Sequence, residues 1–445
     1  MNKVLILGAG MVAKPIVTYL LDNNYFVTVA TMFKSQADAI IQNRRNSQSI
    51  EWTVDNIQLL EKMLFEHDIV VSLLPYKYHV KVAEAAIKCR TNMITASYVS
   101  EQMRALDKEA KKTGIIILNE MGLDPGIDHM SAKRIIDNVH SKGGMIEEFY
   151  SITGALPAPE VAVTNPFSYK FSWSPLGVLM AGNNNARYLR NGKEYTVNSE
   201  FLFRHRAYVF FPELSVFEVY PNRDSLPYKK LYSIEEAKTI YRGTFRYPGW
   251  SEIMDAMKRI GLLSEKQVDA NSLTYRDLMA KLLEVKEHDD LSKVLSNSLD
   301  LPIDSLPERA MKWLGLFENN LVGMNDKLIN ITAKLMIEKM LIRDNERDMV
   351  IMMHFFRVKY NNGKSEIIRS TMLDYGSFIT NTAIARTVSL PAAVAVTLIL
   401  DNKINLKGVQ IPVEPEIYKP VLEKLEDLDI QIYEEYGLAN NMSIF

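Results

Sequence analysis

The chain has 445 residues, of which 47% are hydrophobic and 24% charged, and its formal net charge is −2. This composition is typical of a soluble globular protein with a large core and two or three domains. It lacks the basic excess of nucleic-acid binders. A single cysteine, Cys89, excludes an internal disulfide and fits a reducing compartment. We see no signal-peptide pattern, and the longest apolar run, 390–400, is too short to span a bilayer. We therefore expect a cytoplasmic protein that binds neither nucleic acid nor membrane.

The first thirty residues alternate between strand and helix patterns. Val4–Leu7 is a short apolar run, a GAG turn follows, apolar residues then recur at helical spacing up to Leu21, and Val27–Ala30 is a second apolar run. A strand, a glycine-rich turn, a helix and a second strand form the βαβ unit of dinucleotide-binding folds. Ala13 fits the third position of the motif, where a small residue allows close helix packing.

The alternation continues to about residue 119. We expect strands at 68–76, 92–99 and 115–119, and helices at 79–89 and 101–114. Strands alternating with helices predict an α/β fold with a doubly wound parallel sheet, whose binding crevice lies at the carboxyl ends of the strands. The sequence therefore predicts a Rossmann dinucleotide-binding domain at 1–125.

The pattern changes downstream. Aromatic, strand-like stretches alternate with Pro and Asn turns from 146 to about 247, and a charged helical pattern fills 249–345. Strand patterns then return around an NNG hairpin turn. The expected domains are a mixed α/β substrate and dimerisation domain at 126–248 and 346–389, an all-helical insertion at 249–345, and a C-terminal segment, 390–445, that packs back on the first domain.

The glycine turn is the first candidate site. Gly8 permits a tight turn, and Gly10 lets backbone amides approach a pyrophosphate at the N-terminus of the following helix. GxGxxA alone is a weak signal, but here it follows a strand and opens a helix, which favours a dinucleotide site over a ligand-free turn. The second strand ends in VATMFKSQ, without the acidic residue of NAD sites or the arginine of NADP sites. Lys34 and Ser35 could meet a phosphate or form a solvated loop, so NADP is only weakly preferred to NAD.

The second candidate is the loop LNEMGLDPGIDHM, residues 118–130, directly after the strand pattern GIIIL. Pro125 and Gly126 fix the backbone, and Asp124 could hold a substrate amine or simply form a turn. Asp128 suits the N-terminus of the next helix. Asp124, Asp128 and His129 do not have a recognised ligand spacing, so we expect no metal site.

A third candidate is a set of arginines among aromatic residues: Arg223, Arg242 and Arg246. Arginine forks bind carboxylates bidentately, so several of them suggest a polycarboxylate ligand. The alternative for each is a surface arginine paired with Asp or Glu. Lys170, in NPFSYKFSWSP, is either a substrate or acid/base contact or a solvated strand residue.

Together these blocks resemble the saccharopine dehydrogenases of the glutamate-forming type, also called saccharopine reductases. The matching stretches run in family order along nearly the whole chain: GAGMVAKP, SLLPYKYH, TASYVS, NEMGLDPGIDHM, GALPAPE, NPFSYKFSWSPLGVL, YPNRDS, RGTFRYPG, WLGLF, DNERDMV and LDYG. The resemblance implies an NAD(P)-dependent oxidoreductase acting on a CH–NH bond in lysine metabolism. It would join L-glutamate to L-2-aminoadipate 6-semialdehyde, or split saccharopine. It also implies a homodimer.

The resemblance also implies site residues. With Gly8 from the turn, the expected cofactor contacts are Gly10, Met11, Val12, Thr31, Met32, Phe33, Asp55, Leu74, Ser97, Leu123, Asp124, Pro125 and Ser174. The expected substrate contacts are Ser97, Tyr98, Asp124, Arg223, Thr244, Phe245 and Arg246. In the imine reduction that the family performs, Asp124 would hold the amine and Tyr98 would orient it or relay a proton.

Two positions depart from the family pattern. Met32 stands where a basic residue is frequent, which leaves the cofactor open, and Thr153 stands where a cysteine sometimes occurs, so no thiol is required. Two other functions stay open on the residues alone: a related opine-type imine reductase acting on another amino acid or polyamine, and a non-catalytic nucleotide-binding homologue. The direction of the reaction and the general acid or base stay open as well.

Overall fold

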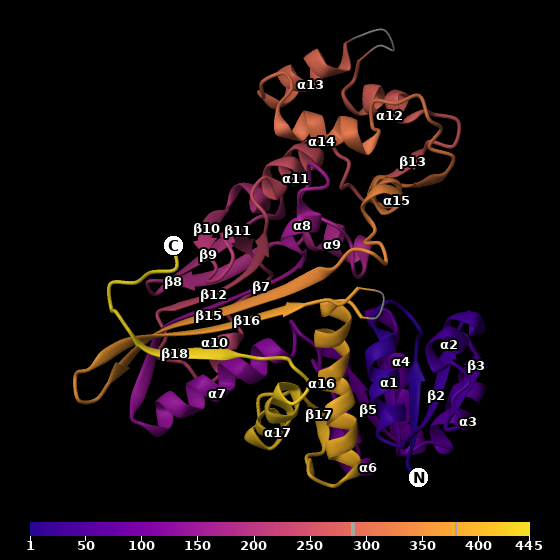
Figure 1. The fold of residues 1–445 in the computed structure, drawn as a ribbon, viewed down its shortest axis with the longest axis vertical. Helices are drawn as coiled ribbons and strands as arrows, with labels where there is room; N and C mark the ends of the chain where they lie inside the picture. Colours follow the sequence, from indigo (N-terminus) through magenta and orange to yellow (C-terminus); the bar gives the residue numbers. More distant parts are fainter. Residues whose placement is uncertain (286–289, 379–380) are drawn as a thin grey trace. The chain divides into compact units, whose positions relative to one another are not determined.

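The computed structural model describes residues 1–285, 290–378 and 381–445 (Figure 1). The chain forms two compact units, each made of two segments. The first unit is Met1–Gly143 with Met372–Tyr433, and the second is Gly144–Thr371 with Glu434–Phe445. Two expectations stay predictions: that 249–345 is a domain of its own, and that the domain boundaries lie where the sequence suggests.

The first unit is built on a parallel seven-stranded sheet with the order β17-β6-β5-β4-β1-β2-β3. The strands are β1 Lys3–Leu7, β2 Phe26–Thr31, β3 Ser47–Glu51, β4 Ile69–Ser72, β5 Asn92–Thr95, β6 Ile116–Leu118 and β17 Gly408–Gln410. The predicted doubly wound α/β fold is confirmed. Two edge strands, β3 and β17, were not predicted, and β17 comes from the C-terminal segment.

The helices of the first unit are α1 Ala13–Asp22, α2 Lys34–Ile41, α3 Ile57–Phe65, α4 His79–Cys89, α5 Glu101–Ala105, α6 Asp107–Thr113, α7 Ile127–Ser141, α16 Ala383–Leu400 and α17 Pro415–Glu426, with a 3-10 turn, η1, at Tyr76–Tyr78. The prediction of one helix over 101–114 was wrong, because the chain breaks at Leu106 into α5 and α6. Val4–Leu7 is fully buried, and burial of each such side chain contributes about 1.5–3 kcal/mol.

Helix α16 is long and apolar enough to cross a membrane, with a mean hydropathy of 1.9 over 18 residues, so the expectation based on the shorter run 390–400 needs correction. Length and composition are weak grounds for a span, because core helices share them. Of this window, 78% is buried inside the protein. The helix packs against α1, α17, β4 and β5, so it serves as a core helix of the first unit.

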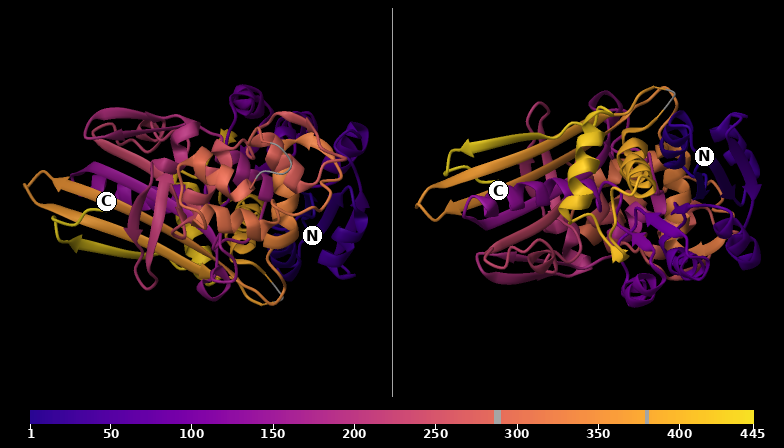
Figure 2. Two further views of the ribbon diagram at one scale, coloured as in Figure 1. Left: turned by 90° about the horizontal axis from the view of Figure 1, so that it is seen from above. Right: turned by 90° about the horizontal axis from the view of Figure 1, so that it is seen from below.

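The second unit holds a mixed nine-stranded sheet with the main order β10-β11-β12-β7-β15-β16-β18, and β8 and β9 join it through β12. Its strands are β7 Gly144–Pro157, β8 Ala186–Arg190, β9 Lys193–Val197, β10 Ala207–Phe210, β11 Val216–Pro221, β12 Thr239–Arg246, β15 Asp348–Tyr360, β16 Ser365–Tyr375 and β18 Tyr433–Leu438. The long strands β15 and β16 lie side by side (Figure 2). The predicted NNG hairpin is confirmed: Tyr360 N–H donates to the Lys364 carbonyl at 2.8 Å, and Gly363 has φ +84°.

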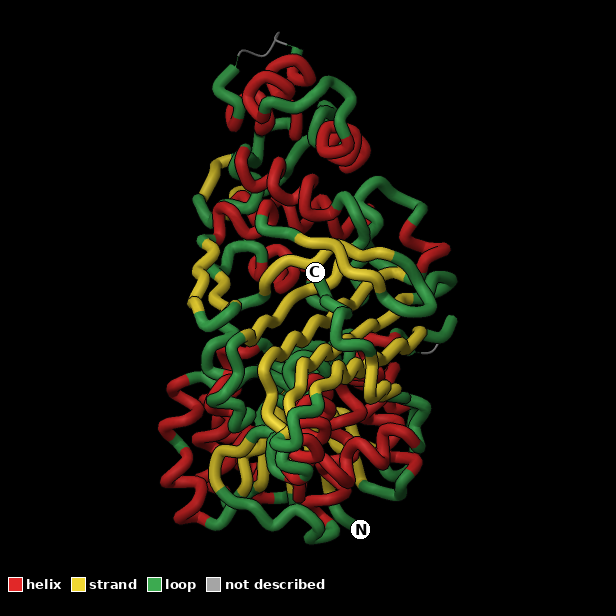
Figure 3. The backbone as a smooth tube through the Cα atoms, turned by 90° about the vertical axis from the view of Figure 1, so that its left-hand side faces the viewer, coloured by secondary structure: helices red, strands yellow, loops and turns green. Residues whose placement is uncertain are grey.

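Four short helices accompany this sheet: α8 Pro159–Ala162, α9 Pro175–Ala181, η2 Ser199–Arg204 and α10 Tyr228–Leu231. The stretch 249–345 holds α11 Trp250–Arg259, α12 Tyr275–Leu282, α13 Leu291–Leu299, α14 Leu306–Leu314 and α15 Leu328–Met340. The expectation that it is all-helical was wrong, because β13 Gln267–Asp269 pairs antiparallel with β14 Asn325–Lys327. Figure 3 shows the strands of the sheets in yellow and the helices in red.

Candidate functional site

The glycine turn has the shape of a phosphate cradle. Gly8 has φ +105°, a Cβ there would lie 3.2 Å from the Leu73 carbonyl oxygen, and its N–H donates to the Ala30 carbonyl at 2.8 Å. A Cβ on Gly10 would meet nothing within 4 Å among the described residues. Helix α1 begins without a side-chain cap at Val12 and without an acidic residue in its first turn. Its first N–H groups can therefore bind an anion, as a pyrophosphate requires.

Apolar side chains are exposed around this turn. Met11 is 48% exposed, and Met32 and Phe33, which follow β2, are each 55% exposed. Solvent-exposed apolar side chains beside a phosphate cradle suit the flat rings of a dinucleotide. The residues present therefore fit the expected cofactor. The structure places Thr31 at the end of β2 and Leu74 just after β4, at the same edge of the sheet.

The charged residues expected near the adenosine ribose are already paired with one another. Lys34 is the first residue of α2, and its ammonium pairs with Asp38 at 3.2 Å. Hydrogen bonds from Ser49 and Lys34 hold the pKa of Asp38 below its usual value. Asp55 is exposed and lies 3.6 Å from the Lys81 ammonium. A 2′-phosphate would therefore have to compete with Asp38 for Lys34.

The acidic loop, residues 118–130, is closed by hydrogen bonds between its own backbone groups. Gly122 N–H donates to the Pro125 carbonyl at 3.0 Å, and Ile127 N–H donates to the Gly122 carbonyl at 2.9 Å. Gly126 has φ +149°, and a Cβ there would lie 1.9 Å from the Gly122 oxygen. Its N–H donates to Asp128 at 2.6 Å. Asp128 lies in the first turn of α7, as predicted. The Asp124–Pro125 peptide is cis.

The structure brings Tyr98 and Asp124 together. Tyr98 lies on the loop after β5 and Asp124 on the loop after β6, and these two strands are neighbours in the parallel sheet. The Tyr98 hydroxyl donates to Asp124 Oδ1 at 2.7 Å. Leu123 and Pro125, on either side of Asp124, are buried, whereas Asp124 itself is partly exposed. An ionised carboxylate accepts up to about four hydrogen bonds, so Asp124 can bind Tyr98 and an amine together.

Sequence reasoning missed the buried polar groups behind this pair. His79 contacts Ser97, and Glu120 contacts the backbone of Val99. Both belong to motifs that support the family resemblance, SLLPYKYH and NEMGLDPGIDHM, and these motifs were the only signal that could have found them.

The remaining predicted residues belong to the second unit. Thr244, Phe245 and Arg246 end β12, where Thr244 is in register with Thr153 of β7. Arg223 is exposed and has φ +55°. Ser174 is also exposed, and its hydroxyl accepts from Gly177 N–H at 3.2 Å as the cap of α9.

Two of the arginines are not surface residues. Arg242 is 2% and Arg246 is 5% exposed, so the surface alternative was wrong for both. The Arg246 guanidinium lies 5.1 Å from the centroid of the Tyr169 ring and 5.5 Å from that of Trp250, within cation–π range. Lys170 was not a solvated residue either, because it is buried and pairs with Glu346.

The sequence also failed to single out Tyr169 and Trp250, whose rings lie beside Arg246, and Trp173, which interacts with Tyr169. Among the described residues, four buried polar atoms make no hydrogen bond of good geometry: the Tyr169 hydroxyl, Arg246 Nε, and the indole nitrogens of Trp173 and Trp250. Buried polar atoms in this state are usually satisfied by water or a ligand. This cluster gives the second unit polar groups that suit a carboxylate.

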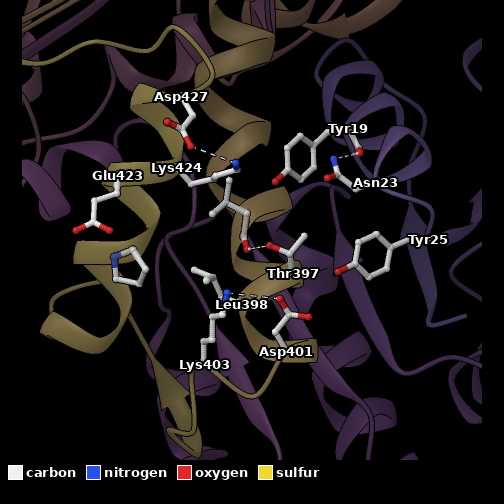
Figure 4. A pocket seen from close by; sticks show the side chains of 12 residues that line it. Tyr19, Asn23, Tyr25, Thr397, Leu398, Asp401, Lys403, Glu423, Lys424 and Asp427 are labelled. Carbon is white, nitrogen blue, oxygen red and sulfur yellow. Dashed lines mark hydrogen bonds and ion pairs between the residues drawn. The ribbon is translucent and has the colours of Figure 1, made fainter.

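A cavity of about 610 Å³ lies elsewhere in the first unit (Figure 4). It is lined by the last turns of α1, α16 and α17, and by Tyr25, which directly precedes β2. Burial raises the pKa of Tyr19, one of its lining residues. Because it lies at the amino end of β2, it is separate from the glycine turn at the carboxyl end of β1.

A parallel doubly wound sheet, a glycine turn after β1 and a carboxylate–phenol pair after β5 and β6 define a Rossmann-type dinucleotide-binding protein. The family models agree: residues 4–118 match the saccharopine dehydrogenase NADP binding domain, and residues 122–430 match the saccharopine dehydrogenase C-terminal domain. The chain belongs to the saccharopine dehydrogenase family.

Three similar proteins extend over almost the whole chain. The L-glutamate-forming, NADP(+) saccharopine dehydrogenase of Saccharomyces cerevisiae is 38% identical over 96% of this chain and 97% of its own. The enzyme of the same name from Schizosaccharomyces pombe is 37% identical over 98% and 99%. The apo structure of the Saccharomyces cerevisiae enzyme covers 98% of this chain and 100% of its own, with a TM-score of 0.90 and 37% identity.

Proposed function

We propose that this chain is an NADP-dependent, L-glutamate-forming saccharopine dehydrogenase that serves lysine metabolism. The observation that carries the proposal is the 2.7 Å hydrogen bond from Tyr98 to Asp124 at the carboxyl ends of β5 and β6. Ligands of doubly wound folds bind at these strand ends. The names of the full-length relatives support the substrate and the cofactor, with NAD as the alternative cofactor.

The bound nicotinamide would supply or accept a hydride at the carbon of the C–N bond. The chain's own contribution is to hold the substrate amine. Asp124 places a negative charge beside that nitrogen and so favours its cationic form. Because Tyr98 donates to one carboxylate oxygen, the pair has a fixed orientation, and the phenol can move a proton at the amine. The tightly wound loop keeps Asp124 in place through turnover.

Saccharopine carries three carboxylates, and we assign their recognition to Arg223 and the segment Thr244–Arg246. Arg246 is almost fully buried, so a carboxylate beside it would make a strong, desolvated charge-assisted bond. We assign the cofactor to residues of the first unit, namely Gly8, Gly10, Met11, Val12, Thr31, Met32, Phe33, Asp55, Leu74, Ser97, Leu123, Asp124 and Pro125. The family resemblance adds Ser174 of the second unit.

We also propose a cytoplasmic homodimer. The second unit exposes Tyr208 and Phe210 on edge strand β10 and Val216 on the neighbouring strand β11, at 54%, 62% and 45%. An exposed apolar patch on a strand edge is typical of a subunit interface. Light scattering of the wild type and of Phe210→Glu would test it, and a monomeric wild type would contradict it.

The test of activity is absorbance at the reduced-nicotinamide band, with L-saccharopine and either NADP⁺ or NAD⁺. We expect reduction with NADP⁺ and slower reduction with NAD⁺. A folded protein that binds the cofactor but reduces neither would overturn the proposal.

A further inference from the structure

The segment that carries Tyr98 is held on both sides by buried polar groups. Ser97 and Val99 flank Tyr98 in the loop between β5 and α5. The Ser97 hydroxyl contacts His79, and the Val99 N–H donates to Glu120. The residue proposed to orient the substrate amine therefore sits between two points of attachment.

His79 provides the first attachment. It begins α4 and is 4% exposed. Its Nδ1 lies 2.9 Å from the hydroxyl of Ser72, the last residue of β4. Its Nε2 lies 2.8 Å from the Ser97 hydroxyl and 3.2 Å from that of Thr95, the last residue of β5. With both ring nitrogens bonded, the imidazole cannot rotate without losing a buried hydrogen bond.

His79 stays neutral while it does this. Burial lowers its pKa from 6.5 to about 4. In the neutral ring one nitrogen donates and the other accepts, and hydroxyl partners can satisfy either arrangement. The contacts of His79 therefore stay the same across the neutral pH range.

Glu120 provides the second attachment. Oε1 accepts from Val99 N–H at 2.9 Å, and the Glu120 N–H donates to the Ser97 carbonyl at 3.2 Å. Its other carboxylate oxygen lies 2.7 Å from Nε2 of His129, which is fully buried on α7. Glu120 also has φ +60°, an uncommon conformation for a residue with a side chain. This strained backbone conformation of Glu120 brings its carboxylate to the 97–99 segment.

We propose that His79 and Glu120 are positioning residues, which hold the backbone of 97–99 so that the Tyr98 hydroxyl meets Asp124. The role of Tyr98 and Asp124 in turnover rests on the proposed function, whereas the positioning of the 97–99 segment does not. Burying a histidine and a glutamate costs more than burying apolar residues of similar size unless every polar atom is bonded. Each of them makes at least one hydrogen bond to the three residues centred on Tyr98, which favours a positioning role over a general stabilising one.

A matched control lies in the same unit. His67 also has both ring nitrogens bonded, to the Met63 carbonyl at 2.6 Å and the Thr28 hydroxyl at 2.7 Å, and burial lowers its pKa too. Its bonds join β2 to α3 and do not involve the 97–99 segment. His79→Asn and His67→Asn should therefore cost similar stability, while only the first should disturb Tyr98. Ser72→Ala and Thr28→Val form a milder pair that removes one partner from each histidine.

The experiment measures saccharopine oxidation, cofactor affinity and amide hydrogen exchange of the peptide spanning 95–101 in these four variants. We expect kcat to fall about tenfold to a hundredfold in His79→Asn and less in Ser72→Ala, since small misplacements of a positioned group are costly. Amide hydrogen exchange in 95–101 should be faster in both His79→Asn and Ser72→Ala than in the wild type. His67→Asn and Thr28→Val should change kcat by less than about threefold, as distant, independent sites do.

A double-mutant cycle completes the test. If His79 acts through Tyr98, His79→Asn should cost little further activity in a Tyr98→Phe background. Fully additive losses, or equal losses in His79→Asn and His67→Asn, would overturn the inference. Unchanged exchange in 95–101 would also overturn it. A wild type without saccharopine oxidation would count against the proposed function alone, because the exchange measurement still decides whether His79 holds the segment.

Discussion

The glycine turn and the acidic loop both follow strands of the same parallel sheet, but they are built in opposite ways. In the turn, Gly10 has open space beside it and α1 starts without a side-chain cap. In the loop, backbone groups bond to one another and Gly126 has no room for a Cβ. A turn that binds a ligand through its backbone must keep N–H groups available. A loop that presents one side chain must instead satisfy its own backbone first.

Gly126→Ala should produce the largest effect. The new Cβ would lie 1.9 Å from a backbone oxygen at a φ that L-residues rarely adopt, so we expect a loss of more than about 4 kcal/mol or no folded protein. Urea unfolding measures it. A variant with wild-type stability would show that the loop is not closed in the way described.

Acid should weaken the fold through the support behind Tyr98. The unfolded chain protonates His79 near its usual pKa of 6.5, whereas the folded chain does so only near 4. The stabilisation is therefore complete above pH 6.5 and is lost as pH falls toward 4, by on the order of 3 kcal/mol. The free energy of unfolding, measured at a series of pH values in this range, should depend less on pH in His79→Asn than in the wild type. Parallel wild-type and variant curves would contradict the assignment.

Asp124→Asn tests the side chain that the loop presents. Turnover of saccharopine should fall about a hundredfold, because the amide cannot favour a cationic amine as a carboxylate does. Stability should stay within about 1 kcal/mol, since Asp124 is partly exposed. Steady-state kinetics and thermal unfolding check the two parts, and unchanged turnover would remove Asp124 from the mechanism.

Gly10→Ala is the counterpart of Gly126→Ala in the turn. Its Cβ meets no neighbour within 4 Å among the described residues, so stability should change by less than about 1 kcal/mol. Affinity for NADP should fall about tenfold, because the methyl group occupies the space where the pyrophosphate approaches the backbone. Isothermal titration calorimetry measures the loss. An unchanged affinity would mean that the cofactor does not use this turn.

Lys34→Ala should produce the smallest effect. The Lys34 side chain is about half exposed and its ammonium already pairs with Asp38, so its loss should weaken NADP binding only about twofold to threefold and leave NAD binding unchanged. A drop of tenfold or more for NADP alone would make Lys34 the main reader of the 2′-phosphate.

The sequence alone was enough to predict the βαβ start, the parallel sheet, the glycine turn and the family. These features depend on local periodicity and on short motifs, which can be recognised in a single sequence. The tertiary structure alone decided that 408–410 adds strand β17 beside β6, that residues 101–114 form two helices, and that Arg242, Arg246 and Lys170 are buried. It also decided that Tyr98 meets Asp124, 26 residues away, and that His79 and Glu120 hold the segment between them. Such contacts depend on strand order and register across the sheet, which no local pattern encodes.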